Sequence, residues 1–422
     1  MTTKQTETNI QPQDTQKIGR AEELALILVL ASIFILTLLF FVIPKRAFSD
    51  NENRYLAKPP AISILALTSG RLTAQVSDYL SDHFPGRDAW LEIQSETSRL
   101  SGKREINQVY IANDNALIDT YKKPVNTKRI TDAFIRMIND APKVNTFLML
   151  VPTALEINAA DLPADCYDKR MPGRQQAVID EIYAETVEAY ELRKETAESA
   201  DGAGTFQTVD VAGALRKAKE TIAQDTPLYF RTDHHWTMRG AYEGYLAYCK
   251  EAGFEPYELS AYQAETVTNS FYGTTWSKLC DSYFKPDDIT VYSDSTWNLT
   301  VTYSDTGEES TSVYNKDYLQ EKDKYSMFLN NLHPLVTIIN RNLAEDKNED
   351  GKAGAVAVVK DSYANCMIPF LINHYRTIYV FDTRYYTDGV TDFIAAHPDI
   401  DTVLLLYNLG TMDSDTGIGG IY

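Results

Sequence analysis

One long apolar run near the amino terminus constrains this chain more than any other feature. Residues 24–43, LALILVLASIFILTLLFFVI, contain no charged side chain, and a helix of that length crosses a hydrocarbon core of about 30 Å. The run is too long for the apolar part of a cleaved signal peptide, and no small-x-small cleavage site follows it. We therefore predict a transmembrane helix at 24–43, preceded by a polar, disordered cytoplasmic tail at 1–23.

Charge limits the partners of the chain. There are 59 acidic and 40 basic residues, which give a formal net charge of −19. Nucleic acids and anionic membrane surfaces repel such a chain at long range. The sequence contains neither a GxGxxG nor a GxxxxGK phosphate-binding loop. We expect no nucleic-acid partner and no cofactor. The basic residues that flank the apolar run are nearly balanced and do not define its orientation.

The pattern of the chain changes twice after the apolar run. Residues 44–106 contain a polar, proline-containing linker and a stretch, residues 73–100, that is typical of two juxtamembrane helices around a Pro-Gly break. From residue 107, apolar strand-like runs alternate with amphipathic helical ones. This alternation predicts one α/β domain over 107–422 with a largely parallel, three-layer sheet. Residues at about 265–330 have alternating polarity and many turn residues, which indicates a small antiparallel β insertion.

A serine lies where one of these apolar strands ends. Residues 355–359 lead directly into Lys360, Asp361 and Ser362, and then into a helical stretch. In parallel α/β sheets, ligands and nucleophiles lie at the carboxyl ends of strands, and a helix N-terminus can stabilise an oxyanion. A helix cap at Asp361 or Ser362 explains the same residues more simply. The serine becomes a candidate nucleophile only if a base lies beside it.

The segment RTDHHWTMRGAY, residues 231–242, contains such a base. The chain has six histidines, and two of them, His234 and His235, are adjacent here. A serine nucleophile needs a general base, usually a histidine that a carboxylate orients. Asp233 lies two residues before His235, on the same side of an extended backbone. We assign His235 as the base and Asp233 as its orienting carboxylate, while His234 points into a substrate groove or into packing.

Two alternative explanations of the histidine pair remain weaker. A metal site needs further ligands, and neither an HExxH nor a CxxC pattern is present, so we expect no metal. A helix cap explains Thr232 or Asp233 but not the two histidines. The four cysteines are widely spaced, and the sequence is compatible either with buried thiols or with a disulfide of undefined pairing; they are Cys166, Cys249, Cys280 and Cys366.

These segments together resemble the bacterial DHHW protein family. RTDHHWTMRGAY resembles the signature that gives the family its name. The chain also has the ENR-x-L segment of the family at 52–56, its D-x-FPGR segment at 82–87 and its DSYA block at 361–364. That family is in turn similar to the SGNH-hydrolase-like domain of the alginate O-acetyltransferases, in which a D-x-H-W segment precedes the serine block. The resemblance implies a flavodoxin-like α/β fold and a catalytic triad that faces outside the cytoplasm.

The resemblance also implies roles for individual residues. Asp233, His235 and Trp236 match the D-x-H-W segment, and Ser362 matches the nucleophile. Lys360 stands where many SGNH proteins have glycine, so the backbone beside the serine differs. The backbone N–H of Ser362 is a candidate oxyanion donor. Further oxyanion or substrate-binding candidates are Trp236, His234, Tyr363, Gly273, Arg384 and Asn408. For Arg384, a ligand carboxylate, a sugar or a surface ion pair are all compatible with its place after a strand.

These expectations lead to one function and one principal alternative. We expect a membrane-anchored serine O-acetyltransferase or acetylesterase that acts outside the cytoplasm on a cell-surface polysaccharide. By resemblance, a membrane-bound O-acyltransferase would supply the acyl group. The alternative is an inactive SGNH-like scaffold that binds glycan or an assembly partner. A structural or adhesion protein is a third hypothesis. Only an enzyme requires His235 within hydrogen-bond reach of both Asp233 and Ser362.

Overall fold

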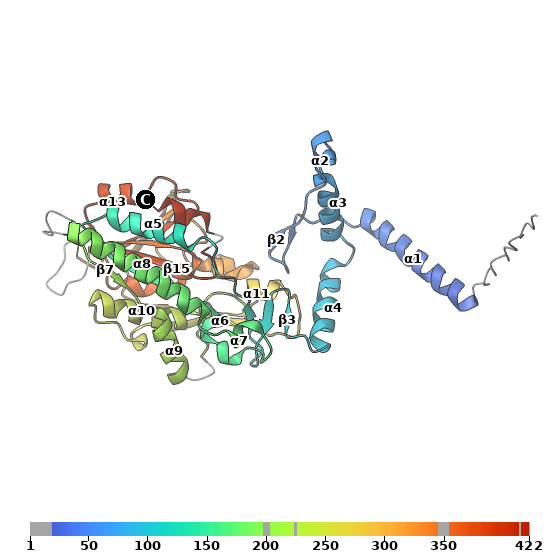
Figure 1. Cartoon of the computed structure of the whole chain (residues 1–422), viewed down its shortest axis with the longest axis horizontal. Helices are drawn as coiled ribbons and strands as arrows, with labels where there is room; N and C mark the ends of the chain where they lie inside the picture. Colours follow the sequence, from blue (N-terminus) through green and yellow to red (C-terminus); the bar gives the residue numbers. More distant parts are fainter. Residues whose placement is uncertain (1–18, 197–202, 223–225, 345–353, 413–414, 422) are drawn as a thin grey trace, which may run out of the picture. The chain divides into compact units, whose positions relative to one another are not determined.

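The protein is divided into two compact units in this computed structural model, which describes residues 19–196, 203–222, 226–344, 354–412 and 415–421 (Figure 1). The first unit contains Met1–Ser49 and Arg54–Trp90, and the second contains Asp50–Asn53 and Leu91–Tyr422. The predicted tail at 1–23 lies largely outside the described residues.

A long apolar helix opens the first unit. Helix α1, Arg20–Val42, has 23 residues and a mean hydropathy of 3.1 over its most apolar window, and none of its residues is buried within the chain. It begins four residues before the predicted span, because Arg20–Glu23 continue the helical turn, and it ends before Pro44, which disfavours helix in the preceding residue. The helix is long and apolar enough to cross a membrane.

The rest of the first unit brings two of the sequence motifs together. Helix α3, Arg71–Asp82, ends before the predicted Pro-Gly break, where Gly86 has a φ of +70° that favours glycine. Helix α4, Arg87–Leu100, begins after the break, and only its residues up to Trp90 belong to the first unit. Arg54, in the ENR-x-L segment, donates a hydrogen bond of 2.9 Å to Asp82, in the D-x-FPGR segment. The hydrogen bonds from Arg54 lower the pKa of Asp82 to about 2. The two motifs are therefore joined by an ion pair.

Helix α2, Ile64–Thr68, and the paired strands β1, Phe48–Ser49, and β2, Arg54–Tyr55, complete the described elements of this unit.

The second unit is built on an eight-stranded sheet in the order β11-β10-β12-β14-β13-β15-β6-β7. Strands β14, β13, β15, β6 and β7 are parallel to one another, as predicted, and β13 is buried along its whole length. The bounds are β6 Asn145–Val151, β7 Phe206–Thr208, β10 Leu299–Tyr303, β11 Glu309–Ser310, β12 Leu335–Asn340, β13 Ala355–Lys360, β14 Thr377–Asp382 and β15 Ile400–Asn408.

One edge of the sheet differs from the sequence prediction. Strand β12, which we placed in the parallel α/β pattern, runs antiparallel to β14 and to β10. Its residues alternate between buried and half-buried, whereas every residue of β13 is buried. That alternation is typical of an antiparallel strand with one covered face. Part of the predicted insertion at 265–330 therefore extends the main sheet through β10 and β11. Only β8, Gln263–Phe271, and β9, Asp287–Ser293, form a separate antiparallel pair.

Helices pack on the sheet of the second unit. Figure 1 shows α5, Thr127–Asp140, beside α8, Arg174–Thr196, and α9, Val211–Thr221, beside α10, Met238–Ala252. Helix α10 also contacts α12, Ile368–Leu371. The other α-helices are α6 Ala154–Ile157, α7 Tyr167–Arg170, α11 Thr274–Ser277 and α13 Val390–Ala396, and the 3-10 helices are η1 Ala159–Asp161, η2 Leu259–Ala261, η3 Lys316–Gln320, η4 Lys324–Met327, η5 Ser362–Cys366 and η6 Thr416–Gly420.

A β-hairpin lies at the start of the α/β domain. Strands β4, Val109–Ile111, and β5, Leu117–Asp119, pair antiparallel, and Asn115 in the turn has a φ of +62°. Strand β3, Glu105–Ile106, pairs with β4 and completes a three-stranded sheet.

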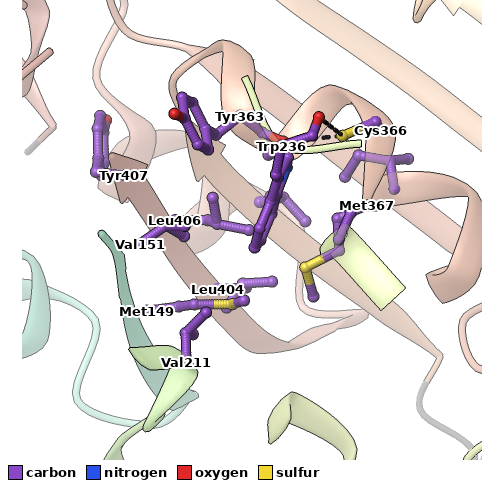
Figure 2. Packing of buried hydrophobic residues seen from close by; sticks show 14 of the residues in the cluster. Met149, Val151, Val211, Trp236, Tyr363, Cys366, Met367, Leu404, Leu406 and Tyr407 are labelled. Carbon is purple, nitrogen blue, oxygen red and sulfur yellow. Dashed lines mark hydrogen bonds between the residues drawn. The ribbon is translucent and has the colours of Figure 1, made fainter. Parts of the chain in front are cut away.

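The core of the second unit surrounds Trp236. Figure 2 shows its indole ring packed over Leu404 and Leu406 of β15, with Tyr363 and Met367 beside it. Trp236 and Tyr363 are both fully buried. The four cysteines are buried and free, so none of them forms a disulfide. The segment that contains the two histidines is thus held inside the sheet domain by its own tryptophan.

Candidate active site

Ser362 is the first residue of η5, directly after the carboxyl end of β13. Asp361, not Ser362, caps this helix, because its side chain accepts a hydrogen bond of 2.9 Å from the backbone N–H of Tyr363. Its other carboxylate oxygen accepts from the N–H of Asn408 and from the hydroxyl of Thr411, at 2.7 and 2.6 Å. The capping role is therefore filled, and the hydroxyl of Ser362 is engaged elsewhere.

The three residues assigned to a triad form one continuous chain of hydrogen bonds. Nε2 of His235 lies 2.7 Å from Oγ of Ser362, and Nδ1 of His235 lies 2.6 Å from Oδ1 of Asp233. His235 and Asp233 are 5% and 2% exposed, whereas Ser362 is half-buried. A half-buried serine, a base and a buried orienting carboxylate thus have the geometry that nucleophilic catalysis requires. Residues 127 positions apart in the sequence meet here.

Asp233 is an ionised carboxylate, and each of its two oxygens accepts hydrogen bonds. Oδ1 accepts from the backbone N–H of His235 at 3.0 Å as well as from its ring. Oδ2 accepts from the N–H and from the hydroxyl of Thr274, at 2.7 and 2.9 Å. Burial alone would raise the pKa of Asp233, but the adjacent His234 and His235 and these hydrogen bonds hold the pKa well below its usual range.

His235 is neutral at physiological pH in this environment. Burial lowers its pKa to about 4, and the nearby His234 adds to this effect, while Asp233 opposes it. The ring of Tyr325 stacks on the imidazole at 3.8 Å with an interplanar angle of 8°. The same tyrosine donates a hydrogen bond of 2.9 Å to the carbonyl of Ser362. Tyr325 therefore contacts both the base and the serine. No sequence pattern indicated a role for Tyr325, since it lies in η4, outside any recognised motif.

Two residues predicted to bind substrate have structural roles instead. The indole N–H of Trp236 donates to the carbonyl of Tyr363 at 2.8 Å, and the hydroxyl of Tyr363 donates to the carbonyl of His234. Both side chains are fully buried, and of the two only Tyr363 forms part of a cavity wall. These bonds clamp the serine segment to the DHHW segment.

Gly273 and Asn408, the remaining candidate oxyanion donors, differ in whether an N–H group is still free to donate. The N–H of Gly273 donates to the hydroxyl of Thr232 at 3.2 Å, so it is not the oxyanion donor that we predicted. A Cβ at Gly273 would lie 2.2 Å from Cβ of Asp233, so this glycine allows the carboxylate its place. Asn408 donates one amide hydrogen to the carbonyl of Val151 at 3.0 Å, which leaves its second amide hydrogen as a candidate donor.

Arg384 belongs to an ion cluster rather than to a surface pair. Its Nε donates to Asp382 at 2.8 Å, and Lys360 contacts the same carboxylate at 3.2 Å. Lys360 and Asp382 are 4% and 0% exposed, and burial lowers the pKa of Lys360 although Asp382 opposes the shift. Arg384 is thus committed to Asp382, and its predicted role in binding a ligand is not supported by its contacts.

A cavity of about 500 Å³ lies beside this site, at the carboxyl ends of β6 and β15. Asp233, His234 and Tyr363 line it on the side of the candidate triad. Its opposite wall comes from the hairpin β4–β5 and the residues after it, which include Asp119 and Thr120. This is the position at which open α/β sheets bind ligands.

Asp233, His234 and His235 could bind one metal ion together only if their present hydrogen bonds were broken. Ligand atoms of Asp233, His234 and His235 lie within 4.8 Å of one another. Both ring nitrogens of His235 are already hydrogen-bonded, and Nδ1 of His234 lies 2.6 Å from the hydroxyl of Thr274. Both ring nitrogens of His235 and Nδ1 of His234 are therefore already engaged in hydrogen bonds within the protein.

The fold and the site define an α/β protein with a serine, a histidine and an aspartate joined by hydrogen bonds at the carboxyl edge of its sheet. Residues 219–381 match the family model described as DHHW protein. The crystal structure of a DHHW family protein from Eubacterium siraeum is similar to this chain, with 25% identity and a TM-score of 0.59 over 75% of this chain and 95% of that one. The resemblance of this chain to the DHHW proteins is confirmed.

Two further solved structures are more distant. Bacillus cereus PatB1, solved with a sulfonyl adduct, is similar with 17% identity and a TM-score of 0.52, over 74% of this chain and 97% of that one. This similarity supports the fold. The O-acetyltransferase domain of Pseudomonas putida AlgJ matches 72% of this chain and 92% of that one at 12% identity, with a TM-score of 0.39. That likeness is too weak to carry an argument. No curated protein matches the chain.

Proposed function

We propose that this chain is a membrane-anchored serine O-acetyltransferase or acetylesterase that acts on a cell-surface polysaccharide. The observation that carries the proposal is the unbroken set of hydrogen bonds from Ser362 through His235 to Asp233. The alternative, an inactive scaffold, has no need for a base between a serine and a buried carboxylate, and the contacts at 2.7 and 2.6 Å favour the enzyme.

The proposed chemistry has two steps. Oγ of Ser362 attacks the acyl carbonyl while Nε2 of His235 takes its proton, and that proton passes to the leaving alcohol as the acyl-oxygen bond breaks. The acyl-enzyme then reacts with a sugar hydroxyl or water, whose proton returns through His235 to Ser362. Asp233 stabilises the imidazolium in both steps. The backbone N–H of Ser362 and the free amide hydrogen of Asn408 are the candidate oxyanion donors.

The proposed location follows from α1. A helix of 23 residues with hydropathy of 3.1 and no buried residue is compatible with a single membrane span. We place the second unit outside the cytoplasm, where a cell-surface polysaccharide is accessible. A membrane-bound O-acyltransferase is the proposed source of acyl groups. The net charge of −19 favours a neutral glycan over an acidic one, because like charges repel.

The test uses the full chain in detergent with p-nitrophenyl acetate as the acyl donor. Ser362→Ala should reduce release of p-nitrophenolate at least about 10³-fold and abolish covalent labelling by a sulfonyl fluoride, detected by mass spectrometry. Ser304→Ala is the matched control, because Ser304 is exposed and its hydroxyl only accepts a bond from the N–H of Leu335. Labelling that persists in Ser362→Ala would overturn the assignment.

A further inference from the structure

His234 is linked to the same carboxylate as His235, but through the hydroxyl of Thr274. Nδ1 of His234 lies 2.6 Å from the hydroxyl oxygen of Thr274, and that hydroxyl lies 2.9 Å from Oδ2 of Asp233. His235 reaches Oδ1 of the same aspartate directly, at 2.6 Å. Asp233 therefore supports two imidazoles, one directly and one through Thr274.

Counting hydrogens assigns the tautomer of His234. A threonine hydroxyl has a single hydrogen, and the ionised Asp233 can only accept, so Thr274 donates its hydrogen to Asp233. The oxygen of Thr274 must then accept a hydrogen bond from Nδ1 of His234. In neutral His234 the lone pair is consequently on Nε2. His235 has the same tautomer, because its Nδ1–H donates to Asp233.

The two lone pairs lie side by side. The centroids of the His234 and His235 rings are 3.8 Å apart. Both Nδ1 atoms face Asp233, at 3.7 and 2.6 Å from Oδ1, so both Nε2 atoms lie on the opposite side of their rings. Nε2 of His235 contacts Ser362. The His234 side chain is more open, at 28% exposed against 7% for His235, and it lines the cavity of about 500 Å³.

We propose that His234 is an acceptor-binding residue that selects a polyhydroxylated acceptor. Nε2 of His234 accepts a hydrogen bond from one hydroxyl of a sugar ring, while His235 takes the proton of the neighbouring, attacking hydroxyl. The O–H bond of the attacking hydroxyl breaks and its oxygen bonds to the acyl carbon. The bond from that carbon to Oγ of Ser362 then breaks, and Oγ takes the proton from His235. This inference rests on the proposed function and adds the residue that binds the acceptor and favours transfer to a polyhydroxylated one.

The walls of the cavity are suited to such a ligand. Thr120, Thr153 and Thr411 line it together with apolar side chains, among them Leu117 and Leu155. Asp119 and Lys278, which also line it, form an ion pair at 2.8 Å, so their charges are balanced. Mixed polar and apolar side chains of balanced charge around a space of this size fit a neutral sugar, which has hydroxyl groups at its edge and C–H groups on its faces.

Two substitutions of His234 separate a ligand-binding role from a structural one. His234→Asn keeps an N–H near the position of Nδ1 for Thr274 but has no atom at the position of Nε2. His234→Gln keeps a polar atom near Nε2 and loses the contact at Nδ1.

The full chain is assayed with p-nitrophenyl acetate as donor and with methyl β-D-glucopyranoside, glycerol or 1-propanol as acceptor. The ratio of acetylated acceptor to released p-nitrophenolate is measured for each variant.

We expect the native protein to transfer acetyl to the glucoside and to glycerol in preference to 1-propanol. His234→Asn should reduce this preference by about tenfold, which is the effect of one lost hydrogen bond, and His234→Gln should retain most of it. The matched control is His397→Asn, since His397 lies just before β15, at the opposite end of the strand from Asn408, and contacts the carbonyl of Phe393.

The inference is overturned if the native protein does not distinguish the glucoside and glycerol from 1-propanol. It is also overturned if His234→Asn retains the preference, or if His234→Gln loses as much of it as His234→Asn. Failure of the proposed function gives a different result, because release of p-nitrophenolate would then persist in Ser362→Ala.

Discussion

The indole N–H of Trp236 donates a hydrogen bond of 2.8 Å to the backbone carbonyl of Tyr363. Trp236 directly follows His235, and Tyr363 directly follows Ser362. The bond therefore joins the two residues that directly follow His235 and Ser362, which contact each other. Since both side chains are buried, this bond fixes the distance between the two segments.

Replacing Trp236 with phenylalanine should affect both stability and turnover. The carbonyl of Tyr363 would lose a buried partner, at a cost of about 1–3 kcal/mol in the free energy of unfolding. The serine segment would then shift relative to His235, and we expect kcat/KM for p-nitrophenyl acetate to fall about tenfold or more. Urea unfolding and initial rates measure the two effects.

A second tryptophan is the control for this experiment. Trp297 also donates its indole N–H to an oxygen, that of the Asn373 side chain at 2.7 Å. Trp297→Phe should reduce stability by a similar amount without changing the turnover of the folded protein. Equal turnover in the two variants would show that the Trp236 bond does not position the site.

The pH dependence of turnover should reflect the buried state of His235. Its pKa of about 4 lies below the usual value of roughly 6.5. The base must be neutral to accept a proton, so activity is present above this pKa and is lost as the pH falls through it. We expect kcat/KM to be nearly constant between about pH 7 and 5 and to decline toward pH 4, with products quantified by chromatography. A midpoint near 6.5 would contradict this assignment.

Adding one methyl group at Gly273 should disturb the candidate triad. Gly273 has an ordinary φ of −83°, so a side chain is prevented there by lack of space alone. Its Cβ would lie 2.4 Å from Oδ2 of Asp233, and the carboxylate would have to move. Gly273→Ala should reduce kcat/KM by about 10²-fold. Gly419→Ala is the control, because that Cβ would meet only the guanidinium of Arg129, at 3.3 Å. A fully active Gly273→Ala protein would be inconsistent with a rigid Asp233.

The ion cluster at the ends of β13 and β14 makes a prediction about stability. Asp382→Asn removes the carboxylate that pairs with both the buried Lys360 and Arg384, and we expect a loss of about 3–5 kcal/mol in the free energy of unfolding. Lys360→Met retains the pair between Arg384 and Asp382 and should cost less. Urea unfolding compares the two variants. A larger loss for Lys360→Met would refute this ranking.

Local patterns in the sequence predicted the parts of the site that depend on a few neighbouring residues. Asp233 and His235 are two positions apart, and Ser362 follows an apolar run, so each could be recognised from its own segment. The roles of Trp236, Gly273 and Arg384 could not, because they depend on partners far along the chain. Burial removes Trp236 from any ligand, and Asp382 engages Arg384.

The errors in the fold have a similar origin. Strand β12 resembles a parallel strand in composition, and only its alternating burial distinguishes it from β13. Tyr325 stacks on the base although it lies in the region that we treated as an insertion. Neither fact follows from propensity or periodicity, because each is set by the pairing of distant segments.

The order of the strands has a consequence for biosynthesis. β13 lies between β14 and β15 in the sheet, and both of these neighbours follow Ser362 in the chain. A nascent polypeptide that extends only as far as Ser362 therefore has its base and its serine but lacks the strands that hold β13 in place. Because a domain folds as a unit, the contact between Ser362 and His235 would be held in place only once β14 and β15 have joined the sheet. A chain that ends before β15 would thus lack the arrangement that we propose for catalysis.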